Sequence, residues 1–259
     1  NGFSPRTDYI ATSSLAPNGS GGAFTKFKLD SAFTHNAEII IEAVDGDKET
    51  FIAKTSGTNG NPIKSEATIT FTGNPNINET ITIISTDGTS KTYSAKTSEN
   101  SSAGTFDANN GPTVSGNTLK AAIEHVNNHG DKITVSHDGN GVLTLTQEDA
   151  GMAGNTTITS GLANTTVNNF AGGGVEFNKG SSALLASQNL QAAINAGEPE
   201  ITVYNNNETL PTLTLVQDSN GPRGNTTVTI NNTFSSAVNG GSVANFANGE
   251  YHKFRIQPA

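Results

Sequence analysis

The chain has 259 residues, which is enough for one or two domains of ordinary size. Its 14 Lys and Arg against 23 Asp and Glu give a net charge of −9, and no basic patch of the kind that duplex nucleic acid requires is present. No apolar run reaches the ~18 residues of a membrane span. The absence of Cys excludes disulfides, thiolate metal sites and a Cys nucleophile.

The first predicted element is an extended arm over residues 1–22. This segment is rich in Gly, Ser, Pro and Thr, which disfavour a helix or a central strand. A segment that cannot build its own core must be held by something else. We therefore expect a neighbouring subunit or another protein surface to hold it, and folding back onto its own chain is the alternative. The expected contact residues are Phe3, Arg6, Tyr9, Ile10 and Leu15.

Two similar strand-rich segments follow the arm. VDGDKETFIAKTS at 44–56 aligns with TDGTSKTYSAKTS at 86–98, an offset of 86 − 44 = 42 residues. Asp45-Gly46 and Asp87-Gly88 are hairpin turn signals between strand patterns. The alternation and the β-branched residues predict strands in the first copy at 27–30, 38–44 and 50–54.

A second pair of similar segments comes later in the chain. LTLTQEDAGMAGNTTIT at 143–159 aligns without a gap with LTLVQDSNGPRGNTTVT at 213–229, an offset of 213 − 143 = 70 residues. LKAAI and LQAAI, each 13 residues after a Phe, predict a short helix in each copy. We expect the first helix to begin at Asn117 or Thr118 and to end by Gly130, and the second to run from Ser187 to Gly197. Strands are expected after the first helix at 133–136, 142–147 and 156–159.

The order front, front, back, back allows two organisations. In one, a module at 66–173 is inserted into an outer module made of 23–65 and 174–249; in the other, the halves pair in crossed fashion. The inner link from Thr97 to Phe106 is only 106 − 97 = 9 residues, and folds avoid crossed connections, so nesting is favoured. We predict an α+β, mainly β fold of two homologous modules. Each module has three strands, one short helix and three strands, and a C-terminal edge strand follows at 250–259.

The repeats also predict the two cores, because matching apolar residues recur on the same side of each expected element. In one module we expect burial of Phe106, Leu119, Ile123, Leu143 and Leu145. In the other we expect burial of Phe177, Leu190, Ile194, Leu213 and Leu215.

Histidines offer the first candidate site. His125 and His129 are spaced i, i+4 on the expected helix, with His137 and Asp138 in the next hairpin, and such spacing can place two imidazoles on one metal. The second copy has Asn195-Ala196-Gly197-Glu198 at this place, so the histidines do not belong to the shared design. Near a helix C-terminus an imidazole is also favourable without a metal. We predict no metal site and no cofactor.

Acidic residues offer the second candidate. Asp45-Gly46-Asp47 and the DGNG at 138–141 lack the closing Glu of a calcium loop and are interpreted as turns. Glu148-Asp149 is replaced by Asp218-Ser219 in the second copy, which favours a solvated turn over an acid–base pair. The chain also has no GxSxG elbow and no phosphate-binding loop. We predict that it is not an enzyme.

Two features resemble known virion proteins. The opening Asn1-Gly2-Phe3-Ser4-Pro5 and the arm, together with Asn61-Pro62-Ile63-Lys64, are similar to head-decoration (cement) proteins of tailed phages. The module with DGT…YSAK, LKAAI and LTLTQ…AGNTT resembles modules in predicted virion proteins of marine phages. The resemblance implies a structural protein on the capsid surface of a virion, in many symmetric copies. It implies contacts with the major capsid protein and with other copies of itself.

The runner-up function is an extracellular binding module, either a phage tail or fibre part or a bacterial surface adhesin or filament subunit. Repeated β modules suit both classes. The chain has no Trp and only four Tyr, which argues against a carbohydrate binder with exposed aromatics. Copy number in purified particles separates the two, because decoration requires hundreds of copies and a tail part only a few.

Overall fold

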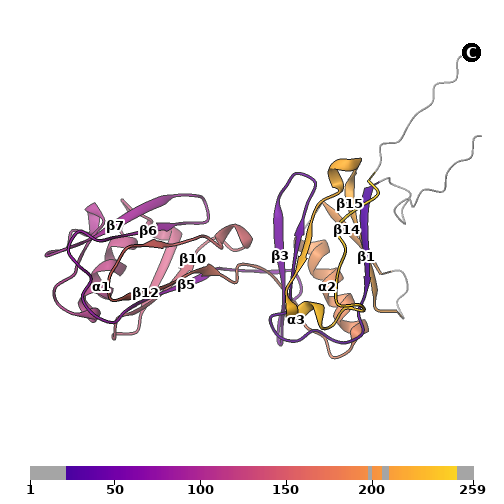
Figure 1. The fold of residues 1–259 in the computed structure, drawn as a ribbon, viewed down its shortest axis with the longest axis horizontal. Helices are drawn as coiled ribbons and strands as arrows, with labels where there is room; N and C mark the ends of the chain where they lie inside the picture. Colours follow the sequence, from indigo (N-terminus) through magenta and orange to yellow (C-terminus); the bar gives the residue numbers. More distant parts are fainter. Residues whose placement is uncertain (1–21, 198–199, 206–209, 250–259) are drawn as a thin grey trace, which may run out of the picture. The chain divides into compact units, whose positions relative to one another are not determined.

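The computed structural model describes residues 22–197, 200–205 and 210–249 (Figure 1). These residues form a mainly β fold with several sheets. The chain divides into two compact units. The first unit comprises the described residues up to Gly60 and from Phe177 onward, and the second unit is Asn61–Glu176. Gly22, expected to end the arm, already opens the first strand; the rest of the arm and the edge strand predicted at 250–259 lie outside the described residues.

One sheet lies wholly in the first unit, and a second lies partly in it. One has the strand order β1-β15-β14 and is covered by helix α2; the other has the order β16-β2-β3-β13-β4. The elements are β1 (Gly22–Lys28), β2 (Glu38–Glu42), β3 (Lys48–Lys54), β13 (Gly174–Asn178), α2 (Ala183–Gly197), β14 (Ile201–Asn205), β15 (Thr212–Asn220), η4 (Pro222–Gly224), β16 (Val228–Ile230) and α3 (Asn232–Ser235).

The second unit contains two four-stranded sheets with helix α1 against them. Their orders are β12-β5-β10-β9 and β11-β6-β7-β8. The elements are β4 (Asn61–Ile63), β5 (Glu66–Phe71), β6 (Thr80–Ile84), β7 (Ser90–Lys96), η1 (Ser101–Ala103), β8 (Thr105–Asp107), α1 (Pro112–Ile123), η2 (Gly130–Lys132), β9 (Ile133–His137), β10 (Val142–Gln147), η3 (Met152–Gly154), β11 (Thr159–Ser160) and β12 (Thr165–Ala171).

Strands from the front segments pair with strands from the back segments. β1 pairs antiparallel with β15, with Phe27 opposite Leu213. β5 pairs antiparallel with β10, with Ile69 opposite Leu143. Among the described residues, no strand at 27–54 pairs with one at 133–159.

Four strands are missing from the prediction of three strands, a helix and three strands: β4, β8, β12 and β13. The strand expected at 156–159 is only the short β11, Thr159–Ser160, and the one expected at 27–30 lies earlier, as β1. Of the four missing strands, β8 precedes α1 and β13 precedes α2. β8 pairs parallel with β7, with Phe106 opposite Ala95. Its three residues bury only Phe106, so the sequence carries no alternation from which β8 could be predicted.

The helix starts also differ from the prediction. α1 begins at Pro112, five residues before Asn117, because Pro is well placed at the first position of a helix, where its missing N–H is not needed. α2 begins at Ala183 and ends at Gly197, so its end was predicted correctly and its start was not. Val126 continues the apolar spacing of Leu119, Ala122 and Ile123 and was therefore expected on the same side of the helix, but it lies beyond the end of α1 and is 83% exposed.

Both predicted cores are confirmed. The ten residues named for them are fully buried. The core of the second unit draws only on residues between Ala67 and Phe170, so it is complete within that unit. Burial of each large apolar side chain stabilises the fold by roughly 1.5–3 kcal/mol.

Candidate functional site

The repeated GNTT segments contain an asparagine that fastens a later part of the chain. In the second unit the Asn155 carboxamide oxygen accepts from the Gly173 N–H at 2.8 Å. In the first unit the Asn225 oxygen accepts from the Gly249 N–H at 3.0 Å. The asparagine therefore has the same role in both units, which is to hydrogen-bond the backbone of a later segment.

A buried glutamine sits beside each of these turns. The Gln147 amide nitrogen donates to the Ile84 carbonyl at 3.0 Å, and its oxygen accepts from the Thr86 N–H at 2.9 Å. The Thr156 hydroxyl donates to the same Ile84 carbonyl at 2.6 Å. Both ends of the carboxamide are thus used to join β10 to the end of β6.

The glutamine of the first unit is only half satisfied. The Gln217 amide nitrogen donates to the Glu42 carbonyl at 2.9 Å and to the Thr226 hydroxyl at 2.8 Å. Its buried oxygen has no hydrogen-bond partner among the described residues. The residue that corresponds to Thr86 is Val44 (86 − 42 = 44), which lacks the hydroxyl that in the second unit donates to the Gln147 oxygen at 3.2 Å.

His129 belongs to a buried pair rather than to a metal site. Its Nε2 lies 3.2 Å from the Thr89 carbonyl, which can only accept, so Nε2 carries the proton. Its Nδ1 then accepts from the Tyr93 hydroxyl at 2.6 Å. Burial lowers the pKa of the His129 imidazole and raises the pKa of the Tyr93 phenol. The imidazole is therefore held neutral.

The other histidines make separate local contacts. His137 Nδ1 lies 2.7 Å from the Asn117 carboxamide oxygen, and its Nε2 accepts from the Gly141 N–H at 3.1 Å. His125 Nδ1 accepts from the Asn127 N–H at 3.1 Å. In the part of the chain that the structure describes, no group of three or more His, Asp or Glu could hold a metal ion.

The acidic candidates are also engaged locally. Glu148 accepts from the Lys64 ammonium at 2.5 Å and from the Thr134 hydroxyl, and these contacts, that with Lys64 first, lower the pKa of its carboxyl. The Asp138 carboxylate accepts from the Asn140 and Val142 N–H groups of its own turn, which lowers its pKa as well. Both groups are ionised at neutral pH, which suits turns and does not suit a general acid.

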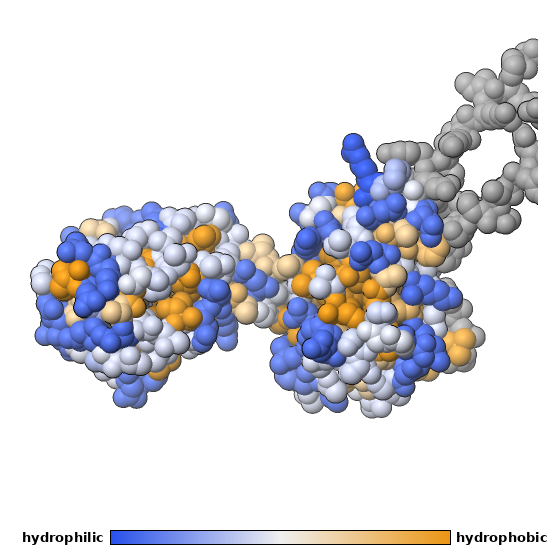
Figure 2. All heavy atoms as spheres, viewed as in Figure 1, coloured by the Kyte–Doolittle hydropathy of each residue, from blue (hydrophilic) through white to orange (hydrophobic). Residues whose placement is uncertain are grey.

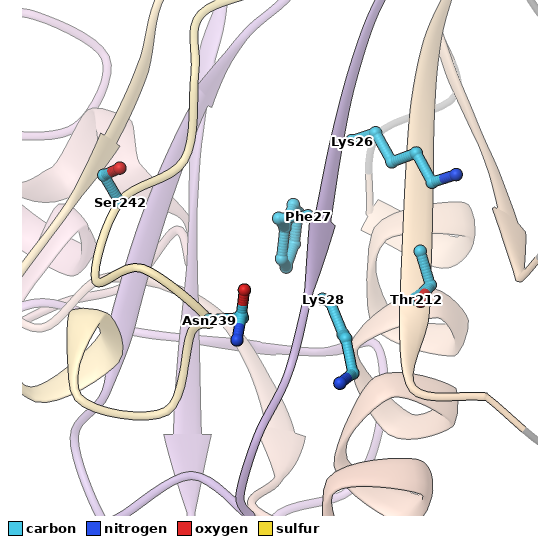
Figure 3. Close-up of a pocket in the computed structure, with 6 residues that line it drawn as sticks. All are labelled: Lys26, Phe27, Lys28, Thr212, Asn239 and Ser242. Carbon is cyan, nitrogen blue, oxygen red and sulfur yellow. The ribbon is translucent and has the colours of Figure 1, made fainter.

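A pocket in the first unit is lined from both sides of β1 (Figure 3). Its volume is about 390 Å³, and its walls come from β1, from Thr212 at the start of β15 and from the segment after α3. The lining residues are Lys26, Phe27, Lys28, Thr212, Asn239 and Ser242.

A difference in length between the two copies marks the place of this pocket in the sequence, and the prediction did not use it. From Thr159 to Phe170 the second unit spans 170 − 159 = 11 residues, whereas the matching stretch of the first unit, Thr229 to Phe246, spans 246 − 229 = 17. The six extra residues fall where α3 and the pocket wall lie.

The surface is mostly polar. Figure 2 shows blue and white over much of both units, with apolar areas on the face of each. Four large apolar side chains among the described residues are exposed by more than a third: Ile77, Val126, Leu185 and Leu210. They come from separate loops and helices.

The arm contacts predicted at Phe3, Arg6, Tyr9, Ile10 and Leu15 lie outside the described residues. Of the helices in the described part, none is long and apolar enough to cross a membrane. No family model, no curated protein and no solved structure matches the chain.

Proposed function

We propose that the chain is a non-enzymatic structural protein of a tailed-phage virion that decorates or cements the exterior of the capsid. One observation carries the proposal: the polar residues that recur in both units form hydrogen bonds within their own unit and stabilise its fold. Asn155 and Gln147, with Asn225 and Gln217, bond mainly to the backbone of their own unit. A protein whose duplicated design is purely structural suits a scaffold, and the resemblance of its opening residues to decoration proteins supports the same role.

The architecture that we propose is one module present twice, with one copy inserted into a loop of the other. Support comes from the matching turns, because Gly151 and Gly221 have nearly the same backbone angles, φ 106° with ψ 172° and φ 108° with ψ 173°. The first unit is made of two chain segments and the second of one, which agrees with an insertion. Insertion is tolerated where the ends of the guest lie close together, and Asn61 is paired with Glu176.

The partners that we propose are the major capsid protein and other copies of this chain. The arm, residues 1–22, would supply the grip, and the acidic body would avoid DNA. The apolar areas seen in Figure 2 could be covered in such an assembly, since exposed apolar surface often marks protein contacts.

The test is to add the purified protein to phage particles that lack it and to count bound copies by quantitative gel. We expect hundreds of copies per particle at saturation. A variant without residues 1–21 should stay folded by circular dichroism and lose attachment. Saturation at a few copies would instead favour a tail or fibre component, and no binding to any particle would contradict a virion role.

A second candidate is an extracellular binding module, on a phage tail or fibre or on a bacterial surface. The pocket beside β1 favours it, because the pocket lies where the first unit is six residues longer than the second and so does not belong to the repeated design. Labelled protein that stains host cells in the absence of particles would favour this candidate.

A further inference from the structure

We propose that Asn140 deamidates spontaneously in the folded protein, with the His137 imidazole as the base that starts the reaction. Asn140 precedes Gly141 in the turn between β9 and β10. A glycine has no side chain to shield its backbone nitrogen, so in an Asn-Gly pair this nitrogen can attack the asparagine side chain and form a succinimide. The attack requires that the glycine N–H lose its proton, and a base in contact with that N–H accelerates it.

The imidazole of His137 lies on the N–H that must lose its proton. The Gly141 N–H donates to His137 Nε2 at 3.1 Å. A backbone N–H can only donate, so Nε2 carries a lone pair and the proton of the neutral ring is on Nδ1. Nδ1 accordingly donates to the Asn117 carboxamide oxygen at 2.7 Å, which orients the ring and holds this tautomer. Both the distance and the tautomer therefore suit removal of the Gly141 proton.

The ring occupies a place that only the second unit provides. The His137 side chain is 6% exposed and packs against Gly116 of α1, where a Cβ would come within 2.7 Å of Nε2. The first unit has Ser187 (116 + 71 = 187) and Asn205 at the matching positions, so it has no imidazole there. Asn140 itself is exposed, so water can reach its side chain and ammonia can leave.

The reaction is an intramolecular displacement followed by hydrolysis. As the bond between the Gly141 nitrogen and the Asn140 Cγ forms, the N–H proton passes to His137 Nε2. The bond from Cγ to Nδ2 then breaks, and the imidazolium returns the proton to the leaving group, which departs as ammonia. Water opens the succinimide to an aspartyl or isoaspartyl residue at position 140. Each molecule thereby gains one negative charge next to the turn carboxylate of Asp138, and the imidazole is regenerated.

Another Asn-Gly pair in the same unit provides an internal comparison. The Gly111 N–H, which follows Asn110, donates to the Asn74 carboxamide oxygen at 3.0 Å. A carboxamide oxygen accepts a hydrogen bond but does not take up the proton at neutral pH. The contact therefore holds the Gly111 nitrogen in place without activating it, and Asn110 should react slowly in the folded protein.

The test is peptide mapping by mass spectrometry of the full chain after incubation at neutral pH, either folded or unfolded in urea. In the folded protein we expect Asn140 to deamidate at least about tenfold faster than Asn110, with isoaspartyl product as the signature of a succinimide. Unfolding removes the contact with His137, so Asn140 should then react more slowly and at about the rate of Asn110. A folded Asn140 that reacts more slowly than the unfolded one would overturn the proposal.

The variant His137→Gln separates a base from a hydrogen-bond acceptor, because a carboxamide can accept from the Gly141 N–H but cannot take up its proton. We expect the rate at Asn140 to fall at least about tenfold, with the rate at Asn110 unchanged because the unit stays folded. His125→Gln, outside this turn, is the matched control and should leave both rates as they are. An unchanged or higher rate at Asn140 in folded His137→Gln would overturn the role of the imidazole as base.

The comparison of the folded and the unfolded unaltered chain does not depend on the folding of any variant, so it decides the proposal even if His137→Gln unfolds. Neither experiment bears on attachment to virions.

Discussion

At the scale of single residues, the most informative pair is Gln147 and Gln217, which occupy matching positions with unequal hydrogen bonding. Replacement of Gln147 by Leu leaves the Thr86 N–H without its partner, while the Ile84 carbonyl still accepts from the Thr156 hydroxyl. Replacement of Gln217 by Leu removes one donor to the Glu42 carbonyl, which still accepts from the Thr226 hydroxyl. It also removes an oxygen that had no hydrogen-bond partner among the described residues. Because an unmade buried hydrogen bond costs about 1–3 kcal/mol, Gln147→Leu should destabilise its unit by about 1 kcal/mol more than Gln217→Leu does.

This difference can be measured by hydrogen exchange, which reports the opening free energy of each unit separately. Equal losses in the two units, or a larger loss for Gln217→Leu, would contradict the assignment of partners.

Leu145 is the residue at which the predicted core is easiest to test. Its side chain is fully buried in the second unit, so Leu145→Ala should lower the free energy of unfolding by about 2–5 kcal/mol in a urea titration. Val126→Ala, at an exposed position, is the matched control and should change it by less than about 0.5 kcal/mol.

His129 should make the stability of the second unit depend on pH. An unfolded histidine titrates near pH 6.5, and burial lowers the pKa of the folded one. Below pH 6.5 the unfolded chain therefore binds a proton that the folded chain does not, and stability should fall as the pH decreases from about 7 to 5. His129→Gln should flatten this slope in thermal melts, while His125→Gln, outside the buried pair, should retain it. A slope that persists in His129→Gln would assign the effect to other groups.

The residue scale also shows what sequence reasoning could reach. All ten core positions were predicted because apolar residues recur at the same places in both copies. The buried roles of Gln147 and His129 were not predicted, because a polar residue in a sequence gives no sign of whether its partner is solvent or a distant backbone group. Only the folded chain brings Thr86 to Gln147, 61 residues away.

At the scale of elements, the closest backbone packing lies at Gly173, which follows β12, and at Gly249, which has the matching place in the first unit. A Cβ on Gly173 would collide with the Gly151 carbonyl and the Ser65 hydroxyl. Gly173→Ala should therefore destabilise the second unit by about 1–3 kcal/mol. Gly161→Ala is the control, since its Cβ would meet nothing closer than the Thr80 carbonyl at 3.7 Å. Equal melting temperatures for the two variants would show that the backbone relaxes at Gly173.

Element boundaries were harder to predict than element identity. The start of α1 at Pro112 and the strand β8 have no periodic apolar pattern, and tertiary pairing with β7 defines β8. The pocket had a signal in the six-residue length difference, but length alone does not say whether a longer loop bulges outward or folds against a strand.

At the scale of the whole molecule, the second unit should fold by itself. Its core contains only its own residues, and its chain ends pair as Asn61 with Glu176. A fragment of residues 61–176 should show cooperative unfolding and dispersed amide signals. A fragment that remains unfolded under native conditions would mean that the unit depends on the rest of the chain.

The pairing of β1 with β15 has a consequence for how the protein is made on the ribosome. The strands that join lie 212 − 28 = 184 residues apart, so at ~5–20 residues per second β1 waits roughly 10–40 s for its partner. The second unit is synthesised in that interval. Once it folds, the pairing of Asn61 with Glu176 shortens the effective loop between β1 and β15, and this lowers the entropic cost of closing the first unit. Because it is synthesised between β1 and β15, the second unit assists the folding of the first. A substitution that unfolds the second unit should therefore first cause aggregation through the unpaired β1.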